Sequence, residues 1–448
     1  MKERGATVAI IGSGGAEAAL VHKYSQSPHV DRLIVIPGND MMREVSLKPV
    51  ETFQTVKATD VGRISRICHD EGVRIADIRQ ERAVEADMAQ ILSEFDITVI
   101  GPTRRAGILE WDKTYGRAIA TLADIPQPNY EVFNDINYIK EVLLRDGDRV
   151  RFVKAAGLAD GKGAMRTASN EEVLRVIEKL KREYPDATFA FLFEEEVIGE
   201  EFSAFAVSDG KSFIRLGEAQ DNKREYDGDL GENTGGMGAN NRPIVVAETE
   251  LQEGIETIFQ KTFDMQRKMK QGKHPYRGVL FLGGMVTERA GEKEIVLVEY
   301  NARWGDPEAQ VIVPGLKVDF FELGMAIAEG RLRNLKIEND GKARVAVAGV
   351  SKGYPRDYSQ VKGKEIRGFT DAKKVDGVTI YGAAVKVEEG KYFANGGRLF
   401  YVVGEGEDVI QARQRAYEAM ERISVEGNNL HYRTDIGWRD VERMRNPE

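Results

Sequence analysis

Apolar runs of strand length alternate with helical patterns from the first residues of this chain onward. The apolar runs occupy residues 7–11, 32–36, 73–78 and 97–100, and the helical patterns occupy residues 16–24, 61–70 and 83–95. Because a helix between two strands favours parallel pairing of those strands, this alternation predicts a small parallel α/β domain. The Gly-Pro-Thr sequence at residues 101–103 marks its expected end.

The later part of the chain changes pattern several times. We expect a helix at 109–122, a break at Pro126 and Pro128, and an alternating segment at 130–197. Strands are expected at 202–220, a Gly-rich loop at 227–239, a helix at 248–270, and two strands at 278–286 and 294–303. Beyond 331 we expect mixed strands with one late helix at 408–423. A chain of 448 residues is too long for one hydrophobic core, so three or four domains are expected.

Composition limits the class of protein. Hydrophobic residues make up 42% and charged residues 31%, which is typical of a soluble globular protein. A formal charge of -9 argues against nonspecific binding of nucleic acid or of an anionic membrane. No apolar run of about 18 residues and no signal-peptide core is present, so we expect a cytoplasmic protein. The single cysteine, Cys68, excludes intrachain disulfides and is expected in a helical core.

The strand expected at 294–303 ends in an unusual set of polar residues. Alternate side chains of a strand share a face, so Glu299, Asn301 and Arg303 should project together, with Tyr300 and Ala302 on the other side. Glu and Asn offer the hard oxygens that Mg²⁺ prefers, and Arg offers a fork for a carboxylate or phosphate. Taken alone, the same pattern also fits the solvated face of an antiparallel sheet.

Two glycine-rich segments follow predicted strands. The first, at residues 12–15, opens a helix, where backbone amides attract anions. Glu17 stands where a dinucleotide fingerprint requires a third glycine, which argues against an NAD site and leaves a phosphate site or a plain tight turn. The second, at residues 154–163, lacks Walker A spacing but suits a flap over a polyphosphate; a surface hairpin is the alternative.

Two further segments carry polar side chains. Acidic residues at 194–201 could bind a base edge and a ribose, or could form a solvated charge run. Residues 227–239 contain five glycines, and a loop this long without regular structure is usually functional or disordered. The basic pair Lys223 and Arg224 just before it favours a functional loop.

In this order, the segments resemble an ATP-grasp ligase and, more narrowly, the phosphoribosylamine–glycine ligase (glycinamide ribonucleotide synthetase) family. The motifs that carry the resemblance lie at residues 37–39, 101–103, 233–239, 299–308, 395–398 and 431–437. The resemblance implies an α/β protein with an ATP-grasp fold. It implies an N-terminal parallel α/β (pre-ATP-grasp) domain at 1–105, an ATP-grasp domain at 106–330 with a lid at about 127–198, and a C-terminal mixed β/α domain at 331–448.

The resemblance also implies roles on the nucleotide side. Lys113 and Lys154 would contact the phosphates of ATP. Lys162 would act from the closing flap, together with Gly161 and Gly163. Adenine would be held by Glu194 and the backbone of Val197, and the ribose by Glu201.

On the side of the reacting groups, Glu299 and Asn301 would bind Mg²⁺ or Mn²⁺. Arg303, with Asp306 in the Gly-Asp-Pro turn, would hold the carboxylate that is activated. Asn233 and Thr234 would close over the acceptor.

The activity implied is the ATP-dependent joining of glycine to phosphoribosylamine through a glycyl phosphate, a step of purine biosynthesis. Two alternatives remain: a paralogous ATP-grasp ligase that uses another amino acid or another amine, and a non-catalytic nucleotide-binding relative. The expected partners are small molecules (ATP, glycine and an amine acceptor), without nucleic acid or membrane. The expected state is a monomer or weak homodimer.

The departures from the family pattern cluster in the N-terminal domain. Ala16 and Ala18 stand where the family usually has Arg and His, and residues 77–82 replace its Gly-Pro-Glu motif. Within that segment, Arg79 and Arg82 could restore a phosphate contact or could merely begin a surface helix. In the flap, Ala156 stands where the family has Asp, and Asp160 where it usually has Ala.

Overall fold

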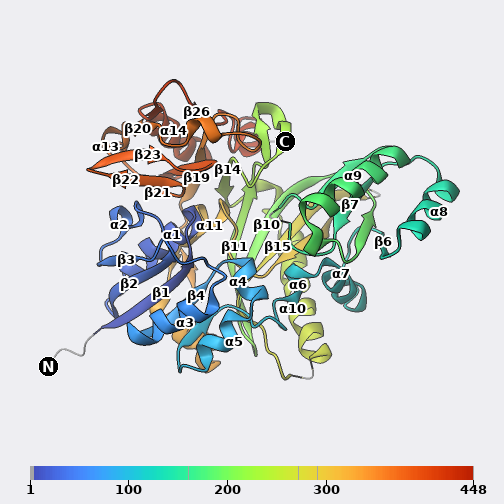
Figure 1. Cartoon of the computed structure of the whole chain (residues 1–448), viewed down its shortest axis with the longest axis horizontal. Coiled ribbons are helices and arrows are strands. Elements are labelled where there is room, and N and C mark those ends of the chain that lie inside the picture. The colour runs from blue at the N-terminus through green and yellow to red at the C-terminus, as the bar shows by residue number, and fades with distance from the viewer. Residues whose placement is uncertain (1–4, 160, 271, 290, 447–448) are drawn as a thin grey trace.

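A computed structural model describes residues 5–159, 161–270, 272–289 and 291–446 of the chain (Figure 1). Asp160, one of the departures in the flap, lies outside the described residues. Within those residues, none of the helices combines the length and the apolar character needed to span a bilayer.

The N-terminal part is the parallel α/β unit that the alternating pattern predicts. Five parallel strands lie in the order β3-β2-β1-β4-β5. The strands are β1 (Ala6–Gly12), β2 (Val30–Pro37), β3 (Val50–Thr52), β4 (Val73–Ile78) and β5 (Thr98–Ile100). The helices are α1 (Gly15–Ser25), α2 (Met42–Val45), α3 (Val61–Asp70), α4 (Glu81–Glu85) and α5 (Met88–Ser93).

Strand β1 is buried on both faces, as expected for the centre of a parallel sheet. Val8 and Ile10 join the large cluster that includes α1 and C-terminal strands. Ala9 and Ile11 join a second cluster with Cys68, which is fully buried as predicted. The sheet is therefore fixed against the rest of the molecule through its α1 face.

A lid of four antiparallel strands projects from the body of the molecule, in green and teal at the right of Figure 1. Its order is β6-β9-β7-β8. Its elements are β6 (Tyr130–Phe133), α8 (Ile136–Asp146), β7 (Arg151–Ala155), β8 (Ala164–Thr167), α9 (Asn170–Glu183) and β9 (Phe191–Glu194). The lid has its own hydrophobic cluster, which includes Phe133, Val153, Ile177 and Phe193.

A nine-stranded sheet runs through the centre in the order β16-β15-β10-β11-β14-β19-β24-β21, with β26 on β19. Its strands are β10 (Glu200–Asp209), β11 (Phe213–Asp221), β14 (Gly238–Asn241), β15 (Arg277–Arg289), β16 (Glu292–Asn301), β19 (Ala343–Ser351), β21 (Val378–Gly382), β24 (Arg398–Gly406) and β26 (Leu430–His431). Because β14 pairs with both β11 and β19, the sheet passes without a break across the boundary expected near residue 330.

Two sequence predictions in this central region are wrong in detail. The helix expected at 109–122 is two helices, α6 (Ile108–Trp111) and α7 (Lys113–Leu122), because the Asp112 carboxylate accepts hydrogen bonds from Thr114 and Tyr115 and so begins a new helix. The segment 227–239 is not structureless, because β12 (Arg224–Tyr226) and β13 (Leu230–Asn233) form a hairpin. The helix expected at 248–270 is confirmed as α10 (Thr249–Met269).

The C-terminal part adds a four-stranded sheet in the order β22-β23-β20-β25. Its strands are β20 (Glu365–Arg367), β22 (Val385–Glu388), β23 (Lys391–Ala394) and β25 (Ser424–Val425). The predicted late helix is α14 (Val409–Met420), but it is followed by α15 (Trp438–Arg445), which the sequence analysis missed. Shorter elements are α11 (Glu308–Ile312), α12 (Phe320–Glu329), α13 (Phe369–Ala372), β17 (Leu316–Lys317) and β18 (Glu338–Asn339).

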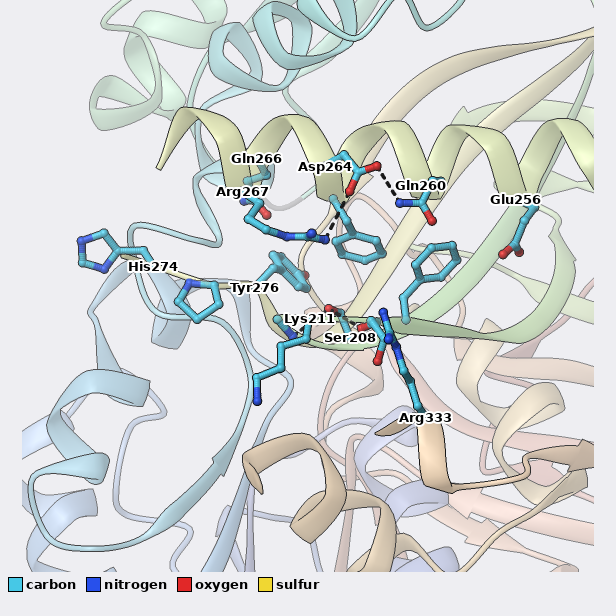
Figure 2. Close-up of a pocket in the computed structure, with 15 residues that line it drawn as sticks. Ser208, Lys211, Glu256, Gln260, Asp264, Gln266, Arg267, His274, Tyr276 and Arg333 are labelled. Atoms are coloured by element: carbon cyan, nitrogen blue, oxygen red, sulfur yellow. Dashed lines mark hydrogen bonds and ion pairs between the residues drawn. The ribbon is translucent and has the colours of Figure 1, made fainter. Parts of the chain in front are cut away.

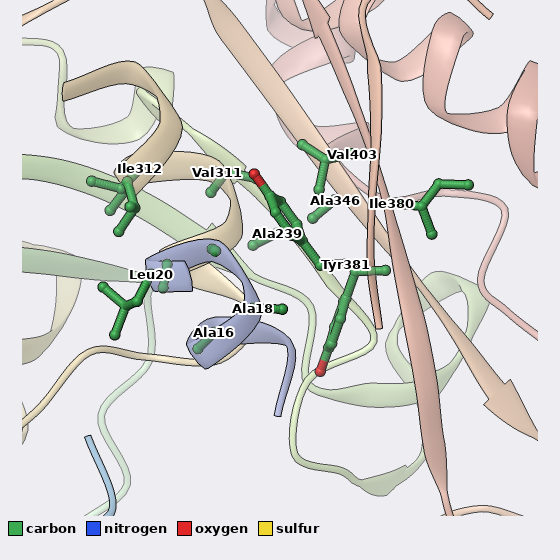
Figure 3. Close-up of a cluster of buried hydrophobic side chains, with 14 of the residues drawn as sticks. Ala16, Ala18, Leu20, Ala239, Val311, Ile312, Ala346, Ile380, Tyr381 and Val403 are labelled. Atoms are coloured by element: carbon green, nitrogen blue, oxygen red, sulfur yellow. The ribbon is translucent and has the colours of Figure 1, made fainter. Parts of the chain in front are cut away.

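The structure gives a physical reason for Ala16 and Ala18. Both side chains are fully buried, in a cluster with Val311 and Tyr381 (Figure 3). A Cβ atom on the preceding Gly15 would lie 2.4 Å from the ring of Tyr401. Since α1 packs this closely against C-terminal strands, an Arg or His at these positions would have to bury a polar group in apolar surroundings.

Candidate active site

At the end of β16, Glu299 and Asn301 lie on one face as predicted, and Arg303 contacts Asn301 from the segment that follows. The amide nitrogen of Asn301 donates to Oε1 of Glu299 at 3.4 Å, and Nη2 of Arg303 donates to Oδ1 of Asn301 at 3.3 Å. The strand itself ends at Asn301, so Arg303 projects from the turn that follows rather than from the strand. The solvated-face alternative is wrong, because Asn301 is only 8% exposed and Arg303 is enclosed by carboxylates.

Three lysines from distant parts of the chain act electrostatically on Glu299. Burial raises the pKa of Glu299, but Lys223, Lys154 and Lys113 outweigh this effect and lower it. The pKa of Lys113 is lowered, first by burial and then by Lys154. Cations that act together on one partly buried carboxylate form an environment suited to a polyanion.

Glu194, at the end of β9, is fully engaged by cations. Arg117 donates to both of its carboxylate oxygens at 2.8 Å, and Nζ of Lys154 lies 2.7 Å from Oε2. Burial opposes ionisation, yet Lys154 and Arg117 lower the pKa of Glu194 to about 2. The carboxylate of Glu194 therefore holds Lys154 in place. Contact between Glu194 and adenine stays a prediction.

Between the lid and β10 the chain crosses a short irregular segment. It contains Val197, which is partly exposed, and it leads to Glu201. Glu201 forms an ion pair with Lys223, and these side chains are 36% and 34% exposed. Because both retain access to solvent, a ligand can reach them.

The expected flap is the turn between β7 and β8. Gly161 and Lys162 are exposed there, and the amide of Ala155 donates to the carbonyl of Gly163 at 2.8 Å. Within the described residues, no ion-pair partner faces the Lys162 ammonium. Lys113 donates to the carbonyl of Gly157 at 2.7 Å, so the base of the flap is tied to the start of α7.

The residues predicted to close over the acceptor leave the β12–β13 hairpin together. Asn233 is exposed at the end of β13, whereas Thr234 is buried. Both the amide and the hydroxyl of Thr234 donate to the carbonyl of Lys223, at 2.7 and 2.8 Å. The two ends of the hairpin are therefore joined next to Glu201.

Asp306 is shared by two arginines from opposite ends of the sequence. Nη2 of Arg398 lies 3.3 Å from Oδ2 of Asp306, and Nη2 of Arg79 lies 3.9 Å from the same atom. Arg79 also donates to Oε1 of Glu17 at 3.2 Å, and the other oxygen of Glu17 accepts from the amide of Gly14 at 2.9 Å. Arg79 is only 8% exposed, so the surface-helix alternative is wrong for it, whereas Arg82 is exposed.

Arg303 is held by two carboxylates that the sequence analysis missed. Its Nε lies 3.1 Å from Oε1 of Glu110 and 3.3 Å from Oε2 of Glu81. Glu110 also accepts from the amide of Ala302 at 2.8 Å, which fixes the turn after β16. The guanidinium therefore has a set orientation before any ligand binds.

The missed residues fall into two groups. Lys223 and Arg398 lie in segments that the sequence pattern singles out, but Lys223 is expected only as part of a basic pair and Arg398 only as part of a motif, and neither is given a role. Glu110 and Arg117 carry no such signal, because each looks like an ordinary charged position of a helix. Their roles depend on contacts with strand ends far away in the sequence.

The donor set at Glu299 fits a hard divalent cation. Among the described residues, no group of three or more His, Cys, Asp or Glu side chains is placed to hold a metal by itself. Glu299 and Asn301 supply two hard oxygens, and Mg²⁺ is usually bound by one or two protein ligands together with phosphate oxygens. The site thus suits Mg²⁺ that arrives with a nucleotide.

A separate cavity of about 320 Å³ lies between the β10–β11 turn and the C-terminal half of α10 (Figure 2). It is lined by polar and aromatic side chains that include Lys211, Tyr276 and Arg333. None of the predicted site residues lines it. The convergence of charged groups on Glu299, rather than this hollow, identifies the candidate active site.

Domains of known proteins match almost the whole length of this chain. The N domain, ATP-grasp (A) domain and C domain of phosphoribosylglycinamide synthetase match residues 6–110, 111–309 and 344–439. Phosphoribosylamine–glycine ligase of Caulobacter vibrioides is 36% identical over 98% of this chain and 99% of that protein. A crystal structure of phosphoribosylamine–glycine ligase from Thermotoga maritima, 28% identical, covers 96% of this chain and 100% of that chain with a TM-score of 0.75.

Other similar proteins differ in length or in sequence. The chain covers 55% of a bifunctional purine biosynthetic protein of Dictyostelium discoideum and 42% of trifunctional purine biosynthetic protein adenosine-3 of Gallus gallus, at 33% and 34% identity. It therefore spans about half the length of these multifunctional relatives. A biotin carboxylase from Campylobacter jejuni, 13% identical with a TM-score of 0.72, covers 98% of this chain and shares its fold.

Proposed function

This chain belongs to the phosphoribosylamine–glycine ligase family, and we propose that it joins glycine to phosphoribosylamine with ATP as the energy source. The products would be glycinamide ribonucleotide, ADP and phosphate. The observation that supports this proposal best is the convergence of Lys113, Lys154 and Lys223 on Glu299, beside Arg303. Such a site can place a polyphosphate next to a carboxylate.

The first step would activate the glycine carboxylate. One carboxylate oxygen attacks the γ-phosphorus of ATP, the bond from that phosphorus to the bridging oxygen breaks, and ADP leaves. Lys113 and Lys154 spread the charge of the phosphates, while Arg303 orients the carboxylate for in-line attack. Mg²⁺, held by Glu299 and Asn301, would supply further positive charge to the phosphate oxygens.

The second step would form the amide. The amine of phosphoribosylamine attacks the carbonyl carbon of glycyl phosphate, the carbon–oxygen bond to phosphate breaks, and the departing phosphate takes up the proton that the nitrogen loses. No protein nucleophile is required. Lys162 and the flap on one side, and Asn233 and Thr234 on the other, would keep water away from the reactive acyl phosphate.

The N-terminal departures support a second candidate, a related ligase with another amine acceptor. Ala16 and Ala18 are buried, and the guanidinium of Arg79 is already engaged by Glu17 and Asp306. The proposed acceptor side of this chain thus differs from the family pattern at Ala16, at Ala18 and at Arg79, which pairs with Asp306.

Phosphate release from ATP separates these candidates. We expect release from the purified protein with Mg²⁺ to require both glycine and phosphoribosylamine, and mass spectrometry should detect glycinamide ribonucleotide. Release with a different amine, and none with phosphoribosylamine, would support the second candidate. Nucleotide binding without turnover on any amine tested would contradict both.

A further inference from the structure

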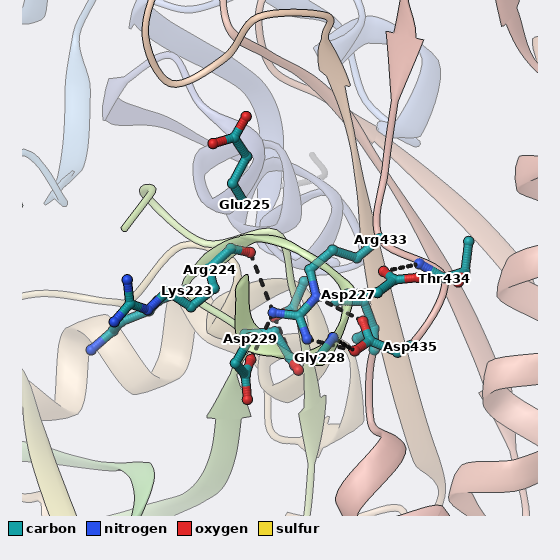
Figure 4. A network of polar contacts seen from close by, with 12 residues as sticks. Lys223, Arg224, Glu225, Asp227, Gly228, Asp229, Arg433, Thr434 and Asp435 are labelled. Carbon is teal, nitrogen blue, oxygen red and sulfur yellow. Dashed lines mark hydrogen bonds and ion pairs between the residues drawn. The ribbon is translucent and has the colours of Figure 1, made fainter. Parts of the chain in front are cut away.

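The motif at residues 431–437 has no part in the proposed chemistry, although it is one of the segments that carry the family resemblance. It lies where β26 ends and before α15 begins, about 200 residues after the β12–β13 hairpin. Figure 4 shows Arg433, Thr434 and Asp435 against the tip of that hairpin. The two segments share a dense set of polar contacts.

Arg433 is the centre of this contact. It is fully buried, and it donates to Asp435 at 2.7 and 2.8 Å, to Asp229 at 2.8 Å and to the carbonyl of Arg224 at 3.3 Å. Burial alone would lower the pKa of Arg433, but Asp435 and Asp229 outweigh burial and raise it. Its bidentate pair with Asp435 fixes the plane of the guanidinium, so the third carboxylate contact fixes Asp229.

The neighbours of Arg433 hold the same hairpin. The amide of Thr434 donates to Asp227 at 2.8 Å, and the amide of Gly228 donates to Asp435 at 2.8 Å. Nε2 of His431 lies 3.0 Å from the carbonyl of Glu225. The contacts therefore run along the hairpin from its first strand to its tip.

The hairpin connects this contact to the candidate active site. Lys223 precedes β12 and Thr234 follows β13, and Thr234 donates twice to the carbonyl of Lys223. Lys223 pairs with Glu201 and contributes most among the cations that lower the pKa of Glu299. A rotation of the hairpin tip would move these two residues together, since they close its base.

We propose that residues 431–435 form a clamp that fixes the β12–β13 hairpin and thereby positions Lys223 and Thr234 for the reaction. Arg433 is then a positioning residue that acts through the hairpin and does not contact substrate. The proposal rests on the proposed function for its catalytic consequence. Whether the clamp holds the hairpin can be measured separately, from hydrogen exchange of the hairpin backbone.

Asp229→Asn tests the clamp by changing the partly exposed hairpin residue that Arg433 contacts, and leaves the buried Arg433 in place. Asp229 has a φ of 56°, a left-handed conformation that Asn also tolerates, so the backbone should be preserved. Arg433 keeps Asp435 as its counter-charge in this variant. We expect kcat to fall about tenfold with KM for ATP within about twofold of wild type, since small misplacement of reacting groups lowers the rate steeply.

Glu232→Gln is the matched control. Glu232 lies on the same hairpin, is 57% exposed and pairs with Arg356 rather than with the clamp. Arg433→Gln is the second test variant, and its thermal unfolding shows whether any lost activity reflects unfolding. Hydrogen exchange of the peptide that covers residues 224–236 should become faster in Asp229→Asn and should not change in Glu232→Gln.

Each outcome has a defined meaning. An unchanged kcat in Asp229→Asn, or an equal loss in Glu232→Gln, would overturn the positioning role. Unchanged hydrogen exchange in Asp229→Asn would overturn the clamp. If wild-type protein releases no phosphate with glycine and phosphoribosylamine, the proposed function fails, and the exchange measurement still tests the clamp.

Discussion

The surroundings of Glu299 and of Asp306, which we propose as the nucleotide side and the acceptor side of the site, differ in the contacts that their charged groups make. Around Glu299, the charges of Lys223, Lys154 and Lys113 outweigh burial and lower the pKa of this carboxylate. Around Asp306, Arg79 and Arg398 share a buried carboxylate, and Arg79 also pairs with Glu17. In the first region each lysine is held by its own partner, and Glu201 and Lys223 keep access to solvent, so a ligand can reach them. In the second region two arginines pair directly with one buried carboxylate and hold loops in place.

The largest effect expected from this comparison is at Glu299. Glu299→Ala should lower Mg²⁺-dependent turnover about a thousandfold, because it removes a proposed metal ligand and a carboxylate on which three lysines act electrostatically. Phosphate release measured over a range of Mg²⁺ concentrations checks this. Glu292→Ala, at an exposed position of the same strand, is the control. Retained turnover in a folded Glu299→Ala protein would refute the metal assignment.

On the acceptor side, the expected effect of Arg79→Met is on stability. Glu17 would remain fully buried without its arginine, which costs about 3–5 kcal/mol for a broken buried pair. Chemical denaturation should report this loss. Adding Glu17→Gln should recover part of the lost stability, since the uncompensated charge is then removed. A double variant no more stable than Arg79→Met would show that Arg79 and Glu17 are not coupled.

The pH dependence of the free energy of unfolding tests the lowered pKa of Glu194, which pairs with Lys154 on the proposed nucleotide side. The pKa of Glu194 is about 2 in the folded protein, below the value of about 4.3 for an unfolded chain. Its contribution, about 3 kcal/mol, is therefore fully present above about pH 4.3 and is lost as the pH falls towards 2. When unfolding of wild type and Glu194→Gln is compared from pH 6 down to pH 3, the difference in stability should shrink to roughly half at the acidic end. A constant gap would contradict the assigned pKa shift.

The smallest effect expected is at Ala18. Ala18→His, which introduces the residue usual in the family, should destabilise the protein by about 1–3 kcal/mol because the site beside Tyr381 is already filled. Thermal unfolding measures this, with His69→Ala at an exposed position of α3 as the control for effects of histidine content. A neutral Ala18→His would mean that α1 can shift away from the C-terminal strands.

The predictions that succeeded depend on local periodicity. Glu299 and Asn301 could be placed on one face because strand alternation is a property of the backbone. Arg79 could not be placed, because its burial depends on Glu17 from α1 and Asp306 from a turn more than 200 residues away. The break at Asp112 was missed because the helical pattern continues through it, and only the capping geometry reveals it.

The four-residue strand β14 makes the molecule hard to divide. Since it pairs with β11 on one side and β19 on the other, a protein cut near residue 331 would leave the backbone groups of Gly238, Ala239 and Asn240 without their partners on β19. An unpaired edge of this kind invites aggregation or pairing with another chain. The two pieces, produced separately, should be poorly soluble, and produced together they should reassemble along that edge. The C-terminal part is thus a structural continuation of the central sheet, not an appendage that can be exchanged freely.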